Sequence, residues 1–107
     1  MLLKTASERE WTPTDYPGIE RSLLRLSESQ GRTSLLRMKA GSRFPAHTHH
    51  AQEDVLVLSG TVSLGGVVLQ AGDYLLTDPG EEHDVVAMQD ALIYVSSDKP
   101  TRILSGE

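Results

Sequence analysis

Residues 41–60 read GSRFPAHTHHAQEDVLVLSG, and this stretch contains His47, His49 and, four residues after His49, Glu53. His83 lies further along the chain, just after a turn made by Asp78-Pro79-Gly80. Three imidazoles and one carboxylate form a ligand set that suits a borderline divalent metal. We therefore predict one divalent metal ion (Fe, Zn, Mn, Ni or Co), bound by His47, His49, Glu53 and His83.

Strand geometry explains how these residues would meet. His47 and His49 are two residues apart, so on a strand both side chains point to the same face, whereas His50 points to the other. Glu53 can reach the same point from the next strand, and His83 can reach it from a neighbouring strand. We expect His50 to lie at the rim of the site and not to be a ligand.

Composition limits what else the chain can do. The 107 residues suffice for one domain, and the net charge of −5 with a pI near 5.3 leaves no basic patch for nucleic acid or an anionic membrane. The arginines between residues 21 and 43 alternate with apolar residues, so we expect them on solvated strand faces. The chain has no cysteine, which excludes disulfides and thiolate chemistry. Without a signal peptide or membrane-spanning run, the default expectation is a cytoplasmic protein.

Short apolar runs separated by glycine-rich turns predict an all-β fold, an antiparallel sandwich or barrel. We expect residues 1–18 to form an N-terminal arm with a short strand near Trp11, residues 19–98 to form the barrel, and residues 99–107 to form a tail. Ile103 and Leu104 of the tail could cover a sheet edge. The predicted strands are 19–26, 32–39, 54–58, 61–64, 67–70, 73–77, 82–88 and 91–96.

The strand after the histidine cluster is apolar on both faces. If Glu53 points into the barrel, period-2 alternation also sends Val55 and Val57 inward and leaves Leu56 and Leu58 outside. The two leucines then need a cover, which the arm, the tail or a second subunit could supply. On this ground we predict a homodimer.

Other residues near the site are mostly apolar. They are candidates to line a pocket beside the metal, although ordinary barrel core is an equally simple role for each one. The candidates are Met38, Phe44, Val55, Val57, Tyr74 and Val85. Tyr74 could instead pack with its hydroxyl at an edge. The sequence has no paired catalytic carboxylates, no serine–histidine–aspartate order and no phosphate-binding loop, so it offers a metal and an apolar pocket without dedicated proton-transfer groups.

The spacing resembles a known superfamily. Residues 41–60 fit the first cupin motif, from Gly41 through the ligand positions to Gly60, and residues 72–83 (GDYLLTDPGEEH) are similar to the second. Two departures occur: Pro79 directly precedes Gly80, and Ala87 stands where the motif often has Asn. The resemblance implies an RmlC-like cupin barrel, a double-stranded β-helix or jelly roll, with His47, His49, Glu53 and His83 as ligands.

Within the cupins the chain is similar to the ChrR-like branch, which includes relatives resembling acetylacetone dioxygenase. The resemblance implies a mononuclear metalloenzyme of the dioxygenase type, with a small oxygenated substrate chelated to the metal. The alternative is a non-catalytic module that binds or senses a small molecule through the metal. Neither alternative involves nucleic acid or a membrane.

Overall fold

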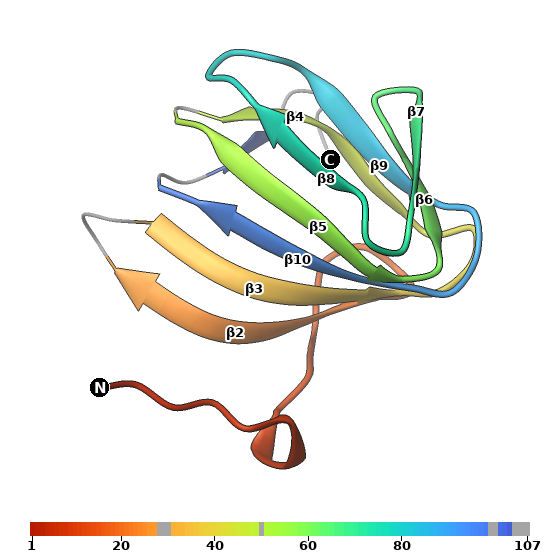
Figure 1. The fold of residues 1–107 in the computed structure, drawn as a ribbon. Coiled ribbons are helices and arrows are strands. Elements are labelled where there is room, and N and C mark those ends of the chain that lie inside the picture. Colours follow the sequence, from red (N-terminus) through yellow and green to blue (C-terminus); the bar gives the residue numbers. More distant parts are fainter. Residues whose placement is uncertain (28–30, 50, 99–100, 104–107) are drawn as a thin grey trace.

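The computed structural model describes residues 1–27, 31–49, 51–98 and 101–103, and for His49 and residues 101–103 it describes the backbone alone. Within these ranges the chain forms two antiparallel sheets that face each other, as Figure 1 shows. A single 3-10 turn, η1 (Ala6–Glu8), lies in the N-terminal arm. The described ranges contain no helix that is long and apolar enough to cross a membrane.

The first sheet has six strands in the order β1-β2-β3-β10-β5-β8. Its strands are β1 (Thr12–Pro13), β2 (Ile19–Ser27), β3 (Gly31–Met38), β10 (Ala91–Ser97), β5 (Glu53–Ser59) and β8 (Tyr74–Thr77). The second sheet has five strands in the order β11-β4-β9-β6-β7. Its strands are β11 (Thr101–Ile103), β4 (Arg43–His49), β9 (His83–Ala87), β6 (Thr61–Leu64) and β7 (Val67–Gln70).

The predicted alternation along β5 is confirmed. Glu53, Val55 and Val57 are buried, whereas Leu56 is half-buried and Leu58 is 44% exposed on the outer face of the six-stranded sheet. Period-2 geometry causes this split, because successive side chains leave a strand on opposite faces. The prediction of an all-β fold made of short antiparallel strands is likewise confirmed.

The space between the sheets is apolar at one end and polar at the other. Aliphatic side chains fill the end near the turns at Gly41, Gly60 and Asp90. This core consists of Ile19, Leu36, Met38, Val55, Val57, Val62, Leu64, Leu69, Val85, Ala87, Ala91 and Ile93. At the opposite end the strands contribute His47, Glu53, His83 and Ser97, all of them buried. The fold therefore places buried polar side chains together at one end of an otherwise apolar interior.

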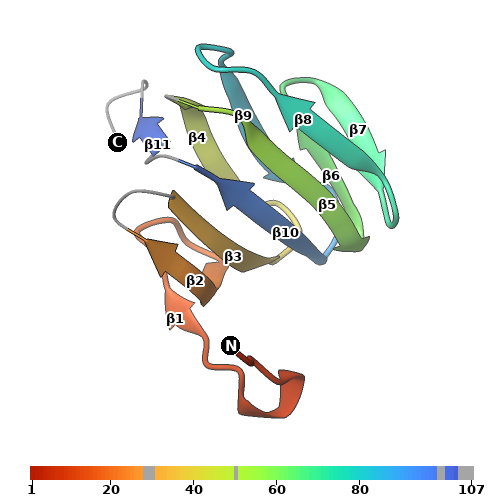
Figure 2. The ribbon, with the colours of Figure 1, turned by 60° about the vertical axis from the view of Figure 1, so that its left-hand side comes forward.

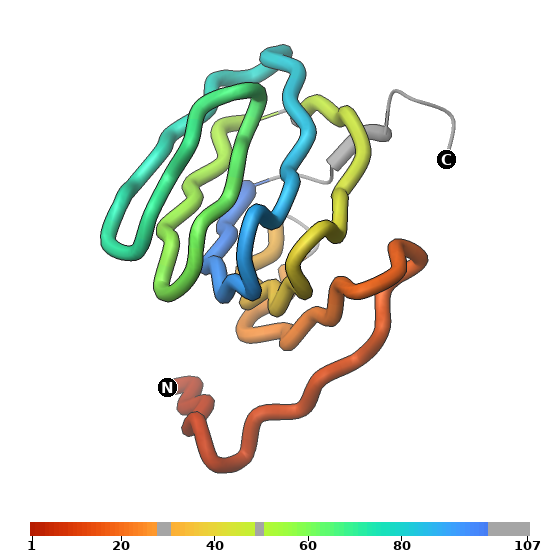
Figure 3. Tube along the Cα trace, turned by 90° about the vertical axis from the view of Figure 1, so that its right-hand side faces the viewer, coloured from red at the N-terminus to blue at the C-terminus, as the bar shows by residue number. Residues whose placement is uncertain are grey.

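The two terminal segments behave differently. The N-terminal arm contacts the barrel through β1, which aligns Thr12 with Arg21, and through Trp11, whose ring centroid lies 4.2 Å from Cζ of Arg37, whereas the start of the arm extends away from both sheets (Figures 1 and 3). Thr101–Ile103, in the stretch predicted to be a tail, instead forms β11 and pairs with the edge strand β4 (Figure 2). This pairing agrees with the expectation that the tail could cover an edge. Leu104 lies outside the described residues.

Candidate metal centre

His47 and His83 are cross-strand partners. His47 on β4 aligns with His83 on β9 in the antiparallel ladder. The two ring centroids are 4.5 Å apart, at an interplanar angle of 84°. Both side chains are buried, with 3% and 6% of their surface exposed. Residues far apart in sequence thus meet because directly opposed side chains on one face of a ladder lie within about 5 Å.

A β-bulge turns His47 inward. The register passes from Phe44 opposite Val85 to His47 opposite His83, so β4 uses one more residue than β9 over this interval. Phe44 and His47 have opposite parity and would face opposite sides of a regular strand, but an extra residue restores both to the same face. Pro45 fits at this position because a bulge tolerates a residue that lacks an N–H donor.

The bulge also fixes the proton on the His47 ring. Nδ1 of His47 lies 2.7 Å from the carbonyl oxygen of Pro45. A carbonyl only accepts hydrogen bonds, so Nδ1 carries the proton and donates it, which leaves the lone pair on Nε2. A ring held in this tautomer by a backbone carbonyl is the usual arrangement for a histidine that binds a metal.

Glu53 approaches from the facing sheet. It is the first residue of β5, it is buried, and its Oε1 lies 3.5 Å from Nε2 of His83. The hydroxyl of Thr77 on the neighbouring strand β8 donates a 3.4 Å hydrogen bond to the Glu53 carbonyl oxygen. One nitrogen or oxygen atom from each of His47, Glu53 and His83 lies within 4.8 Å of the others. A divalent ion at about 2.0–2.2 Å from each atom fits such a group.

The structure brings together three of the four predicted ligands. The backbone of His49 lies in β4 and pairs with Thr101, but its side chain lies outside the described residues, as does all of His50. The ligand role of His49 therefore stays a prediction from its two-residue spacing to His47. The rim position of His50 also stays a prediction.

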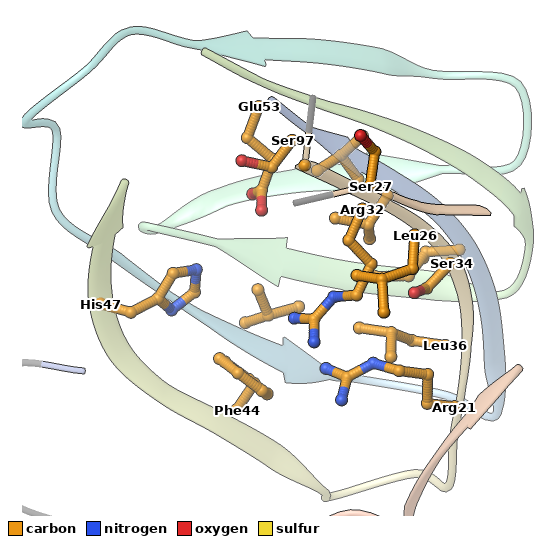
Figure 4. Close-up of a pocket in the computed structure, with 15 residues that line it drawn as sticks. Arg21, Leu26, Ser27, Arg32, Ser34, Leu36, Phe44, His47, Glu53 and Ser97 are labelled. Carbon is orange, nitrogen blue, oxygen red and sulfur yellow. The ribbon is translucent and has the colours of Figure 1, made fainter. Parts of the chain in front are cut away.

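A cavity of about 320 Å³ opens beside this cluster, between the two sheets (Figure 4). His47 and Glu53 form part of its wall, and so do three of the predicted pocket residues, Phe44, Val55 and Val85. The Phe44 ring packs edge-on against His47, with centroids 4.9 Å apart. A ligand in this cavity would contact two of the clustered polar residues directly.

The other predicted pocket residues lie elsewhere. Val57 and Met38 are almost completely buried in the apolar core, where the interior is filled. Tyr74 is 56% exposed, and its hydroxyl donates a 2.5 Å hydrogen bond to Oδ2 of Asp54. Tyr74 aligns with Leu56, whose side chain points outward, so placing Tyr74 in the pocket was wrong. The alternative role, packing with the hydroxyl at an edge, describes it better.

Two arginines that we expected on solvated faces line the cavity instead. Arg21 on β2 aligns with core residue Leu36, and Arg32 on β3 has the same parity as Ser34 and Leu36. Burial lowers the pKa of Arg21, and the nearby charge of Arg32 lowers it further, while Tyr16 acts in the opposite direction. The alternation along β3 was the signal that could have placed Arg32 inside. Alternation of an arginine with apolar residues does not by itself decide which of the two faces is the solvated one.

Comparison with known proteins gives one family match and one curated relative. The model of a family described as the ChrR cupin-like domain matches residues 1–101. A protein of Arabidopsis thaliana described as a DNA damage-repair/toleration protein is 33% identical over 100 residues, which cover 87% of this chain and 31% of that protein. This chain thus spans about a third of the length of the curated relative that it matches.

Solved structures share the fold at low identity. A candidate acetylacetone dioxygenase from Methylibium petroleiphilum has a TM-score of 0.90 at 20% identity, over 99% of this chain and 82% of that one. The anti-sigma factor ChrR of Rhodobacter sphaeroides, solved in complex with SigE, has a TM-score of 0.77 at 25% identity, over 89% of this chain and 52% of that one. The predicted cupin jelly roll is therefore confirmed.

Proposed function

We propose that this chain, which belongs to the ChrR cupin-like domain family, is a metal-dependent enzyme of the dioxygenase type that acts on a small oxygenated organic molecule. The observation that carries the proposal is the convergence of His47, Glu53 and His83, of which His47 and Glu53 also line a cavity. A metal centre that adjoins a cavity can accept a substrate oxygen, whereas a structural centre is closed off by its protein ligands.

The cluster fits a divalent metal on its own chemistry. Two imidazoles and a carboxylate are buried together, and the His47 tautomer leaves Nε2 ready to bind. We propose His47, His49, Glu53 and His83 as the ligands. When bound, a divalent metal would supply Lewis-acid or O2-activating chemistry.

The remaining residues of the cavity would position the substrate. Phe44, Val55 and Val85 present apolar surface next to the polar cluster, which excludes water and packs against the hydrocarbon part of a ligand. A diketone or hydroxyaryl ketone has two adjacent oxygens on a small apolar frame, so it matches this combination. The structural likeness to a candidate acetylacetone dioxygenase supports the same substrate class.

The test begins with the native metal, measured by elemental analysis of protein purified without an affinity tag. Protein reloaded with Fe(II) is then assayed in an oxygen electrode with a panel of diketones and hydroxyaryl ketones. We expect at least one compound to raise O2 uptake, and His83→Ala to abolish the increase. No uptake with any compound, from protein shown to contain stoichiometric iron, would contradict the enzymatic proposal.

A second function is favoured by one specific likeness. The anti-sigma factor ChrR, solved in complex with SigE, has the same fold at 25% identity. We therefore propose, as the second candidate, a non-catalytic module that binds or senses a small molecule through the metal. Native zinc, together with ligand binding that shifts the melting temperature but causes no turnover, would favour this alternative over the dioxygenase.

We also propose that the chain assembles as a homodimer. The outer face of the six-stranded sheet exposes Leu58, Leu76 and Tyr74 by 44%, 43% and 56%. On this sheet Trp11 of the N-terminal arm lies against Arg37 of β3, while the start of the arm extends away from the strands and β11 pairs within the other sheet (Figure 2). A second subunit is the remaining cover among those that the sequence suggested.

A further inference from the structure

The cavity beside the candidate metal centre contains more positive than negative charge. Arg21 and Arg32 line it together with Glu53, which is the only carboxylate among the described lining residues. Figure 4 shows both guanidinium groups pointing into the cavity, toward the side occupied by His47 and Phe44. A divalent metal at Glu53 would neutralise that carboxylate and leave the guanidinium charges without a counter-charge among the described lining residues.

Two polar groups at the arginine side have unused hydrogen-bonding capacity. Nε of Arg21 is buried and has no hydrogen-bond partner among the described residues, and the same holds for the hydroxyl of Ser34, which is 4% exposed. Ser34 lines the same cavity. Buried polar atoms are nearly always paired with protein or with ordered water, so an unpaired donor in a cavity wall is available to a group that enters the cavity.

The sheet geometry explains why these residues face inward. Arg32, Ser34 and Leu36 alternate along β3 on the inner face, and Arg21 on β2 lies opposite Leu36. Placing two like charges beside each other in a partly buried site costs folding free energy unless an anion compensates them. Clusters of like charges that cost folding free energy are more typical of binding sites than of clusters with a purely structural role.

We propose that Arg21, Arg32 and Ser34 form an anion-binding site that receives the oxyanion group, carboxylate or phosphate, of a small organic ligand. Guanidinium groups bind both oxyanions through paired N–H donors, and a serine hydroxyl adds a further donor. The apolar wall between the two ends, which includes Leu36, Val55 and Ile93, suits the hydrocarbon part of the ligand. A volume of about 320 Å³ restricts the ligand to a small molecule.

The anion site is independent of the proposed metal chemistry, and only the idea that one ligand spans both ends rests on the proposed function. In that arrangement the oxyanion binds the arginines while the oxygens at the other end of the ligand face His47 and Glu53. The natural ligand would then be a keto or hydroxy acid, or a phosphate monoester, in place of a neutral diketone.

The test uses chelator-treated protein, so that it does not depend on a metal. Isothermal titration calorimetry compares 4,6-dioxoheptanoate with its uncharged methyl ester, and inorganic phosphate is titrated separately. We expect the carboxylate or the phosphate to bind at least about tenfold more tightly than the ester, because only the anions pair with the guanidinium groups. The more tightly bound anion identifies which oxyanion the site takes.

Variants locate the binding. Arg21→Met and Arg32→Met are each expected to lose at least about tenfold in affinity for the anion and nothing for the ester. Arg25→Met is the matched control. Arg25 lies on β2, as Arg21 does, but its side chain faces away from the cavity and donates a hydrogen bond to the hydroxyl of Thr33. Melting temperatures of all variants confirm folding, and we expect Arg21→Met to melt no lower than wild type.

The proposal is overturned if both anions bind no better than the ester, or if Arg25→Met weakens binding as much as the cavity variants do. The same titration repeated with Zn(II)-loaded protein separates the two proposals. Anion binding without any metal binding would contradict the proposed metal centre and leave the anion site standing.

Discussion

Glu53 brings a carboxylate into a position that is only 5% exposed, next to His83. A buried carboxylate is costly unless a cation or hydrogen-bond donors compensate it, and a divalent metal would do so best. We predict that Glu53→Gln, which keeps the shape and removes the charge, weakens Zn(II) binding at least about tenfold. Competition titration with a chromophoric chelator measures this, with Glu82→Gln in the exposed turn as control. Equal affinity of Glu53→Gln and wild type would exclude Glu53 as a ligand.

Tyr74 and Asp54 form a surface pair whose pH dependence can be predicted. The hydrogen bond to Asp54 raises the pKa of Tyr74 above its ordinary value, and the negative charge of Asp54 contributes in the same direction. Because the folded-state pKa is the higher one, the stabilisation by this pair is complete at neutral pH. It is lost as pH rises from about 10, the tyrosine value in an unfolded chain, through the folded-state pKa.

Replacing Asp54 tests that cause. We expect Asp54→Asn to lower the pKa of Tyr74 toward about 10, since the carboxylate charge is gone. An NMR titration of the tyrosine ring carbons resolves Tyr74 from Tyr16 and Tyr94. Asp98→Asn, at another exposed position, serves as control. An unchanged midpoint in Asp54→Asn would show that the hydrogen bond does not persist in solution.

The positions of single residues differ in how well they can be predicted from the sequence. His47, Glu53 and His83 could be grouped because metal ligation restricts the residue types and the strand period restricts their spacing. The cavity positions of Arg21 and Arg32 were not predicted, because a charged residue in an alternating strand usually lies on the solvent-exposed face. The position of Tyr74 follows from its alignment with Leu56, and that alignment requires the β5–β8 register, which the sequence does not supply.

Glycines at strand ends set the turns that connect the two sheets. Gly60, between β5 and β6, has φ of +80°, and a Cβ there would lie 2.1 Å from the carbonyl oxygen of Asp90. Gly72 has φ of +91°, but a Cβ there would meet no described atom within 4 Å. The two positions therefore separate the cost of a positive φ from the cost of a backbone clash.

We predict that Gly72→Ala lowers the free energy of unfolding by about 1–2 kcal/mol, the cost of a left-handed backbone conformation for a residue with a Cβ. Gly60→Ala adds a clash that only a backbone shift can relieve, so we expect a loss of about 4 kcal/mol or more. Urea denaturation of both variants measures the difference. Similar losses at the two positions would show that the turn before β10, which contains Asp90, moves away from the new Cβ at little cost.

Strands were easier to predict than their irregularities. Alternation of apolar residues and glycine-rich turns located most elements, including β5, β6 and β7, to within a residue or two. The bulge at Pro45-Ala46 has no comparable signal, yet it decides that both Phe44 and His47 face the cavity. Bulges depend on the partner strand, so local sequence alone does not predict them.

The candidate metal centre joins the two sheets of the molecule. His47 and His83 belong to the five-stranded sheet, and Glu53 belongs to the six-stranded sheet. A metal held by all three would cross-link the layers at the end where the apolar core is absent. Binding to the folded state alone stabilises by about 2.7 kcal/mol when free metal exceeds the Kd a hundredfold.

We therefore predict that excess chelator lowers the melting temperature by about 10 °C or more in a domain of this size. Calorimetric scans with Zn(II) and with chelator measure the change. His83→Ala should melt at the same temperature under both conditions, because it lacks a ligand from one sheet. A chelator effect of equal size in His83→Ala would place the metal at some other site.

The outer face of the six-stranded sheet exposes apolar side chains that no described segment covers. Its exposed apolar residues lie on β5 and β8, and a stable dimer needs about 1,200–2,000 Å² of buried surface centred on such residues. A charge placed among them would be desolvated on association, so we predict that Leu58→Glu is monomeric where wild type is a dimer. Val68→Glu is the control, because Val68 is 52% exposed but lies on β7 in the other sheet. Sedimentation velocity at micromolar concentration distinguishes the species. A monomeric wild type would refute the dimer. Dissociation caused by Val68→Glu alone would place the interface on the five-stranded sheet, because only residues inside an interface lose their water on association.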